Sequence, residues 1–304
     1  VWCQGQTQHT ISNAMVRASC LLQLALGNIG RSGGGANIFR GHDNVQGCTD
    51  IGPNPDSLPG YYGLAEGSFK HYASVWGVDF DWIKGRYAPG MMTKPGMTVS
   101  RWFDGVLEKN ELIDQPSNLR GLFYWGHAPN SQTRGPDMKR AMDKLDLLVV
   151  VDPFPSATAA MAAMPGNAGD LNPNRAVYLL PACTQFETSG SLTASNRSMQ
   201  WREKVIEPLF ESRSDHMIMY QLAEKLGFGK ELVKNYEMQK VKGMDEPQPE
   251  SITREWNRAV WTIGMTGQSP ERLKAHMRNM HVFDVNTLRA KGGIDKETGY
   301  KLDG

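Results

Sequence analysis

The segment from Asn37 to Asp50 holds the densest group of side chains that could bind a ligand. A guanidinium presents a planar fork of N–H donors that matches a carboxylate or a phosphate. Apolar residues precede Arg40, which favours burial, and a buried arginine needs an anionic partner. The segment therefore predicts an anion site, with a solvated polar loop as the alternative. Its polar residues stand among glycines that allow close backbone approach: Arg40, His42, Asp43, Asn44 and Gln46, with Gly35, Gly41 and Gly47.

A second place for chemistry follows two apolar runs in the middle of the chain. Gly126 and His127 come directly after residues 122–125, and Asp152 comes directly after residues 147–151. In an open parallel sheet, ligands bind beyond the carboxyl ends of the strands. A glycine there lets N–H groups approach phosphate oxygens, and an acid can accept from ribose hydroxyls or a guanine N–H edge. The alternative is that Gly126 only makes a tight turn and Asp152 only caps a helix.

Other polar residues give weaker signals. Glu187 and Gly190, then Asn196 and Arg197, follow a third apolar run, and a loop with a helix cap is the simpler interpretation. The sequence has no Gly-x-Gly-x-x-Gly pattern, so an ordinary NAD site is poorly supported. The four cysteines show no Cys-x-x-Cys spacing, which argues against zinc or an iron–sulfur cluster bound by this chain: Cys3, Cys20, Cys48 and Cys183.

The elements that must position these residues have an α/β pattern. Residues 122–125, 147–151 and 176–180 are short continuous apolar runs, which are typical of parallel strands buried on both faces. Apolar residues at helical spacing over 138–145 place a helix between the first two runs. The sequence therefore predicts a parallel sheet with flanking helices.

The flanking regions are predicted to be mainly helical. Helices are expected over 8–27, 100–110 and 157–164, with loops over 48–66 and 165–174. Three further helices are expected to start near Ser214, Ser251 and Ser269, because serine is a good N-cap residue. The Lys-, Glu- and Pro-rich stretch 240–250 is predicted to be a linker.

Composition excludes some classes of function. The chain has 304 residues, 40% of them hydrophobic, which is enough for one large or two ordinary domains. A net charge of +1 argues against nucleic acid as the main partner, and no apolar run approaches a membrane span. The chain opens without Met on an apolar Val1-Trp2, so we expect a fragment of a longer polypeptide.

Several of these segments together resemble the catalytic (alpha) subunit of molybdenum- or tungsten-dependent formate dehydrogenases, which belong to the bis-molybdopterin guanine dinucleotide oxidoreductases. The resemblance covers most of residues 1–228 and is most specific in the run from Arg40 to Gly47. Gln200-Trp201-Arg202 resembles the respiratory, periplasmic branch. One departure is Ala128, where the family usually shows Asn or Asp before Pro129. The other matching segments are 6–10, 26–30, 33–37, 58–61, 149–152 and 180–197.

The resemblance implies oxidation of formate to CO2 at a Mo or W ion held by two pterin dithiolenes. It implies that Arg40 clamps the formate carboxylate, while His42 adjusts the local charge or contacts the pterin. It implies no metal ligand in this chain, because the metal ligand and a 4Fe-4S cluster belong to an absent N-terminal part. The expected cofactor-binding residues are Gly5, Thr7, Gly41, Gly126, His127, Asp152 and Glu187.

The same resemblance implies a division of the chain and a set of partners. Residues 1–118 would belong to the molybdopterin domain, 119–228 would bind the guanine dinucleotide, and 229–304 would form a helical extension or linker. An iron–sulfur electron-transfer subunit and a periplasmic location are expected, and the isolated fragment is expected to be inactive. Two alternatives stay open, namely another oxyanion such as nitrate as substrate, or a non-catalytic scaffold.

Overall fold

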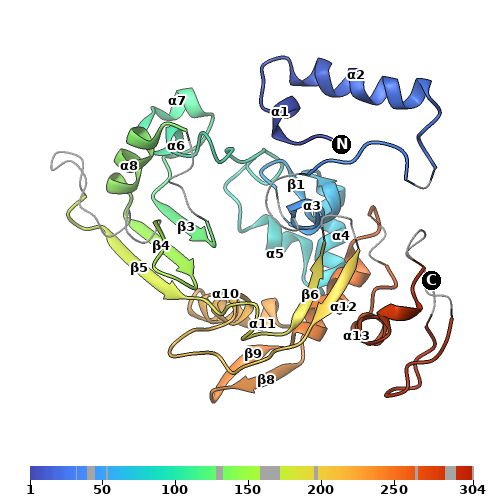
Figure 1. Ribbon diagram of the computed structural model, residues 1–304. Coiled ribbons are helices and arrows are strands. Elements are labelled where there is room, and N and C mark those ends of the chain that lie inside the picture. The colour runs from blue at the N-terminus through green and yellow to red at the C-terminus, as the bar shows by residue number, and fades with distance from the viewer. Residues whose placement is uncertain are drawn as a thin grey trace.

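A three-stranded parallel sheet forms the centre of one half of the molecule (Figure 1). Its strands are β3 (Gly121–Trp125), β4 (Leu147–Asp152) and β5 (Ala176–Pro181), paired in that order. The predicted parallel strands are thereby confirmed. The computed structural model describes residues 1–31, 33–39, 45–52, 54–127, 133–157, 172–194, 198–263, 266–284 and 292–302.

The central strand β4 is buried on both faces, as its continuous apolar sequence predicts. Leu148 and Val150 pack with Met138 and Met142 of α8 (Gly135–Lys144) on one face. Val149 and Val151 pack on the opposite face with Ile218 of α10 (Asp215–Lys225). The prediction of burial on both faces is wrong for the outer strands. Phe123 and Tyr178 are exposed because α10 covers only part of its face, and Leu179 is exposed on the opposite face, on which α8 packs.

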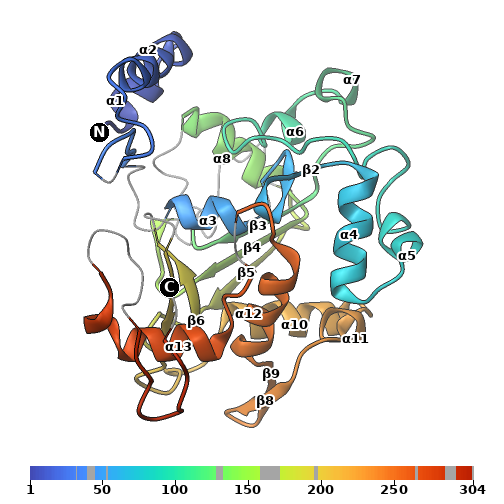
Figure 2. The same cartoon turned by 90° about the vertical axis from the view of Figure 1, so that its right-hand side faces the viewer.

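The other half of the molecule packs helices around a short ribbon. Strands β6 (Gly190–Thr193) and β7 (Met199–Arg202) pair antiparallel. Helix α4 (Glu66–Trp76) lies beside α12 (Pro249–Ala259), as Figure 2 shows, and Tyr72 and Val260 form the core between them. Further helices of this half are α5 (Phe80–Lys84), α11 (Gly229–Leu232), α13 (Pro270–Arg278) and the single turn η3 (Met280–Val282).

Two predictions about the connecting regions are wrong. The expected linker 240–250 holds an antiparallel hairpin, β8 (Met238–Val241) and β9 (Met244–Pro247), and then the start of α12. Lys242 and Gly243 both have positive φ, as a two-residue hairpin turn requires. The expected loop 48–66 contains the end of α3 (Val45–Ile51), a turn of helix η1 (Pro59–Tyr61), and the pair β1 (Ser57–Leu58) and β2 (Tyr62–Gly63).

The helix predictions fare better. Helix α2 (Ser12–Ala25) lies within the expected 8–27, and a separate short α1 (Gln4–Thr7) precedes it. Ser214 and Ser269 cap α10 and α13 through their hydroxyls, as predicted. Only α6 (Asp104–Leu107) and the start of α7 (Asn110–Ile113) are helical in the expected 100–110. Among the described residues, we find no helix with the length and apolar character that crossing a membrane needs.

Candidate functional site

Gly126 and Asp152 lie next to each other at the carboxyl edge of the sheet. Trp125 pairs with Val151, so the two strands end at the same level, and the Gly126 amide donates to the Val151 carbonyl at 2.9 Å. Gly126 has a φ of +58°, and a Cβ there would meet nothing within 4 Å. The backbone of Gly126 is therefore uncrowded, and it lies next to the end of β4, where Asp152 follows Val151.

One oxygen of the Asp152 carboxylate forms a hydrogen bond within its own loop. Its Oδ1 accepts the Phe154 amide at 3.0 Å, which fixes the turn after β4. A hollow of about 210 Å³ adjoins it, lined by Phe154, Leu180 and Pro181 among others. Just beyond, the hydroxyl of Ser156 is buried and has no hydrogen-bond partner among the described residues. An acceptor and, four residues later in the chain, an unpartnered hydroxyl thus follow β4.

A larger cavity of about 660 Å³ lies between the sheet and α10. Trp125 and Tyr178 line it from the strands, and Gln221 lines it from the helix. Trp125 donates its indole N–H to Asp215 at the start of α10, which holds the ring at the cavity wall. Arg213 and Lys225 add positive charge there, and Glu211 adds one negative charge. The cavity offers aromatic surface and polar groups at the ends of the strands.

His127 turns back onto the sheet. Its ring stacks on Tyr124 at a centroid distance of 5.7 Å and an interplanar angle of 14°. Burial raises the pKa of the Tyr124 phenol, so that phenol stays neutral at ordinary pH. Ala128, the departure noted in the sequence, lies outside the described residues.

Glu187 lies in the loop between β5 and β6, and its carboxylate is fully engaged within the protein. The side chain is buried, with 4% exposure. One oxygen accepts from the amide and hydroxyl of Thr184, and the other from the Leu209 amide and the Ser212 hydroxyl. Burial alone would raise the pKa of Glu187, but these four donors lower it to about 2. The contacts fix the path of the chain from β5 into β6.

The segment expected to bind the anion is only partly described. Arg40, Gly41 and His42 lie outside the described residues. The residues just before them pair with the N-terminal segment: Trp2 donates to the Asn37 carbonyl at 3.1 Å, and Phe39 donates to the Trp2 carbonyl at 2.9 Å. Gly5 and Thr7 sit in α1, directly after Trp2. The structure thus brings the segment carrying Gly5 and Thr7 to the residues that lead into Arg40.

On its other side the same segment leads into α3, which crosses β6. Gly47 of α3 is buried, and a Cβ there would overlap the carbonyl of Thr193. The Thr193 hydroxyl and the Trp2 indole N–H are both buried without a hydrogen-bond partner. Strand β6 in turn continues from β5 through the loop held by Glu187. The run of chain from Pro181 to Thr193 therefore connects the two predicted places for chemistry. One is the sheet edge at Gly126 and Asp152, and the other is the segment from Asn37 to Asp50.

A large polar cofactor needs hydrogen-bonding groups that the protein itself leaves unused. Buried polar groups normally have a partner. Three unpartnered polar atoms lie beside the candidate positions, on Trp2, Ser156 and Thr193. An open carboxylate and an uncrowded glycine stand at the sheet edge. Such a donor and acceptor set fits a ligand that brings its own polar groups. No local pattern singles out Trp2 or Ser156, since burial of their polar atoms depends on tertiary packing.

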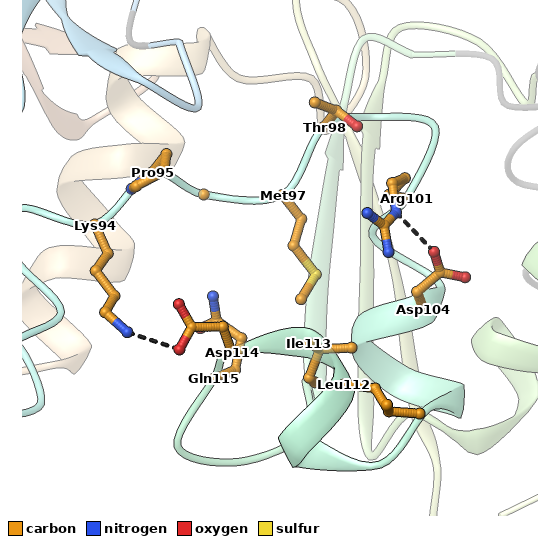
Figure 3. A pocket seen from close by; sticks show the side chains of 11 residues that line it. Lys94, Pro95, Met97, Thr98, Arg101, Asp104, Leu112, Ile113, Asp114 and Gln115 are labelled. Atoms are coloured by element: carbon orange, nitrogen blue, oxygen red, sulfur yellow. Dashed lines mark hydrogen bonds and ion pairs between the residues drawn. The ribbon is translucent and has the colours of Figure 1, made fainter.

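A third cavity, of about 390 Å³, is chemically self-contained (Figure 3). Lys94 pairs with Asp114 at 2.9 Å at one end, and Arg101 pairs with Asp104 at 3.0 Å at the other. Burial would raise the pKa of Asp104, but hydrogen bonds from Arg101 and Arg134 lower it below its ordinary value. Each charge at this cavity already has an opposite charge beside it.

The side chains that bind metal ions most often are those of His, Cys, Asp and Glu. In the ranges that the structure describes, no three His, Cys, Asp or Glu side chains gather closely enough to hold a metal ion. All four cysteines are free thiols, and burial is the main reason that the pKa of Cys183 rises to about 11.

Comparison with known proteins agrees with the geometry. The family described as molybdopterin oxidoreductase matches residues 1–225. The chain is 32% identical over 229 residues to the F420-dependent formate dehydrogenase subunit alpha of Methanocaldococcus jannaschii, covering 75% of this chain and 29% of that protein. It is 31% identical over 256 residues to the formate dehydrogenase subunit alpha of Megalodesulfovibrio gigas, covering 74% and 25%. It is 32% identical over 233 residues to the probable oxidoreductase YjgC of Bacillus subtilis, covering 75% and 20%.

The matched region takes in every candidate position discussed above, from Gly5 and Thr7 to Glu187. The chain spans less than a third of the length of these relatives. The match over residues 1–225 shows that this chain belongs to the molybdopterin oxidoreductase family.

Proposed function

We propose that this chain is part of the catalytic subunit of a formate dehydrogenase. The observation that carries the proposal is the similarity of residues 1–225 to a family whose matching relatives include formate dehydrogenase alpha subunits. A parallel sheet supports the proposal, since Gly126 and Asp152 follow neighbouring strands at its carboxyl edge, where open α/β sheets bind ligands. The reaction is the loss of two electrons and one proton from formate to give CO2.

The cofactor we propose is a bis-molybdopterin guanine dinucleotide carrying Mo or W. When bound, it supplies a metal centre that accepts the two electrons from formate. Asp152 would accept guanine N–H groups with its free oxygen, and Gly126 would let the backbone approach a phosphate. Gly5, Thr7 and Gly41 would contact the pterin side, and His127 would stay close to the nucleotide. A 4Fe-4S cluster is proposed for the part of the subunit outside this chain.

Glu187 has a different role in the proposal. Because its four contacts are all internal, we assign it to the loop that joins the nucleotide edge to β6. Without the carboxylate, the partly buried amide and hydroxyl of Thr184 would lose the partner that they share. Glu187 would therefore act on the cofactor only by holding this loop in place.

Arg40 would bind the formate carboxylate through two parallel N–H bonds. Formate is so small that most of its binding free energy must come from such a charged pair. A bidentate clamp also fixes which way the C–H bond points. His42, two residues on, would tune the charge around the bound anion. Arg40 and His42 carry these roles by resemblance in the run Arg40–Gly47.

The proposal also covers the partner subunit, the location of the complete enzyme, the division of the chain and its activity in isolation. An iron–sulfur subunit would receive the electrons, since relatives of this chain are named as alpha subunits. A periplasmic location is favoured by the resemblance of Gln200-Trp201-Arg202. The division at residues 118 and 228 stays a prediction, and so does the inactivity of this chain on its own.

The test is an assay of the complete subunit, purified with its cofactor and without added partner. We expect formate to reduce an artificial viologen acceptor, and we expect the released cofactor to contain guanine. Reduction of nitrate by reduced viologen, with no formate oxidation, would favour the oxyanion alternative. Absence of bound pterin together with absence of either activity would favour the scaffold.

A further inference from the structure

Helix α3 and strand β6 touch backbone to backbone at Gly47. Gly47 is the third residue of α3 and is fully buried. A Cβ built on Gly47 would overlap the Thr193 carbonyl and would lie 2.7 Å from the Thr193 Cβ. Non-bonded carbon atoms prefer separations of about 3.5–4.0 Å. Any residue larger than glycine would therefore push α3 away from β6 by about 1 Å.

Strand β6 is the fixed partner at this crossing. It pairs with β7 from Gly190 to Thr193, and the Ser191 hydroxyl forms a hydrogen bond of 2.8 Å with the Thr253 hydroxyl of α12. Thr193 and Thr253 are both buried, with exposures of 3% and 2%. By contrast, α3 has only seven residues. Helix α3 also packs on η1, where the Tyr61 hydroxyl donates to Asp50 at 2.7 Å, and at Gly47 it is β6 that limits how closely α3 can approach.

The segment directly before α3 in the chain is Arg40–Asn44. We infer that Gly47 is a positioning residue, which seats α3 on β6 so that the substrate-binding segment before it is correctly placed. The inference rests on the proposed function of Arg40. It assigns Gly47 no contact with formate or cofactor. Its effect follows from geometry, since a misplacement of about 1 Å in a substrate-positioning group can cost on the order of 10²-fold in rate.

Gly67 offers a matched control for Gly47. It lies in the first turn of α4, as Gly47 does in α3, and a Cβ there would meet nothing within 4 Å. Alanine favours helix over glycine at both positions. Gly67→Ala should therefore be neutral or slightly stabilising, and any opposite effect of Gly47→Ala must come from the contact with Thr193.

The experiment compares Gly47→Ala and Gly67→Ala in the complete, cofactor-loaded enzyme. Rates are expressed per bound pterin, so that loss of folded or loaded protein does not count. We expect Gly47→Ala to raise the KM for formate at least tenfold while the KM for the viologen acceptor stays within twofold. Gly67→Ala should leave both values unchanged. A merely structural role would lower the yield or Tm of Gly47→Ala but leave the formate KM of the loaded enzyme unchanged.

A second variant keeps the inference testable if Gly47→Ala fails to fold. Thr253→Val preserves the side-chain shape but removes the hydrogen bond that anchors β6. We expect it to raise the formate KM about two- to fivefold, again with an unchanged acceptor KM. Loaded variants that keep the wild-type formate KM would overturn the inference and leave the proposed function standing. A wild-type enzyme that binds pterin but does not oxidise formate would instead overturn the proposed function.

Discussion

The Gly126 amide donates to the Val151 carbonyl across 2.9 Å, so the chain leaves β3 directly beside the end of β4. This contact puts the uncrowded backbone of Gly126 next to the end of β4, where Asp152 follows Val151. In the proposed nucleotide site the two residues would act through different atoms, Gly126 through close backbone approach and Asp152 through hydrogen-bond acceptance. Their adjacency leads to the first prediction.

Asp152→Asn should weaken binding of the guanine end of the cofactor. The asparagine oxygen can still accept from the Phe154 amide, so the turn after β4 survives. The negative oxygen that would accept guanine N–H groups is replaced by a donor. A charge-assisted hydrogen bond contributes roughly 1.5–3 kcal/mol, so we expect affinity to fall about tenfold or more. Cofactor content of the complete enzyme, measured as guanine released per protein, gives the result.

Asp56→Asn is the control for this substitution, because Asp56 is exposed. It should leave guanine content at the wild-type level. Equal guanine content in Asp152→Asn and the wild type would remove Asp152 from the nucleotide site.

Glu187→Gln should lower the stability of the folded protein, and it leaves every other charged side chain in place. The amide NH2 of glutamine would face donors on Thr184 or on Leu209 and Ser212, so two buried hydrogen bonds are lost. We expect a loss of about 2–4 kcal/mol in the free energy of unfolding. Thermal unfolding measures it, with the exposed Glu111→Gln as control. A Tm equal to that of the control would show that the network contributes little.

The same carboxylate gives a prediction for pH. Its pKa falls from 4.5 to about 2 in the folded protein, despite burial, because of the four donors. A depressed pKa contributes stability above about pH 4.5, and this contribution disappears as the pH falls toward 2. The stability difference between wild type and Glu187→Gln should therefore be largest above pH 4.5 and shrink as the pH falls. Tm measured at several pH values tests this, and a difference that grows in acid would contradict it.

The buried ion pair between Asp143 and Arg175 should matter far more than an exposed one. Asp143 of α8 lies 3.1 Å from the Arg175 guanidinium, and both side chains are less than 10% exposed. Removing one partner leaves a buried charge, so Asp143→Ala should cost about 3–5 kcal/mol. Asp245→Ala breaks the exposed pair with Lys240 and should cost less than about 1 kcal/mol. Similar Tm losses in the two variants would argue against a charged pair in the core.

The sheet could be predicted because its signal is local. Residues 147–151 are all apolar, and a continuous run of that length has few alternatives to a buried strand. The hairpin at residues 238–247 was missed because its strands are rich in charge and its turn is Lys242-Gly243 rather than Asn-Gly. Exposure of Tyr178 was missed because a sequence does not show how much of a sheet face one helix will cover.

The candidate site likewise contains some residues that a local sequence pattern predicts and others that depend on contacts between distant segments. Gly126 and Asp152 could be found because each directly follows an apolar run, and parallel pairing then brings them together. The contact between Gly47 and Thr193 joins segments far apart in the chain, so no local pattern reports it. Glu187 could be recognised as a notable acid from its motif, but two of its four internal donors depend on where residues 209–212 return to it.

The most direct test of formate as the substrate is the effect of Arg40 on turnover. Loss of a charged contact of roughly 1.5–3 kcal/mol slows a reaction by about ten- to more than a hundred-fold. Arg40→Lys keeps the charge but loses the fork, so it should be impaired less than Arg40→Ala. The measurement is kcat/KM for formate in the complete enzyme, with pterin and metal content determined on the same samples. Full cofactor with kcat/KM reduced in the order wild type, Lys, Ala is the predicted result, and an Arg40→Ala enzyme with full cofactor and unchanged kcat/KM would contradict it.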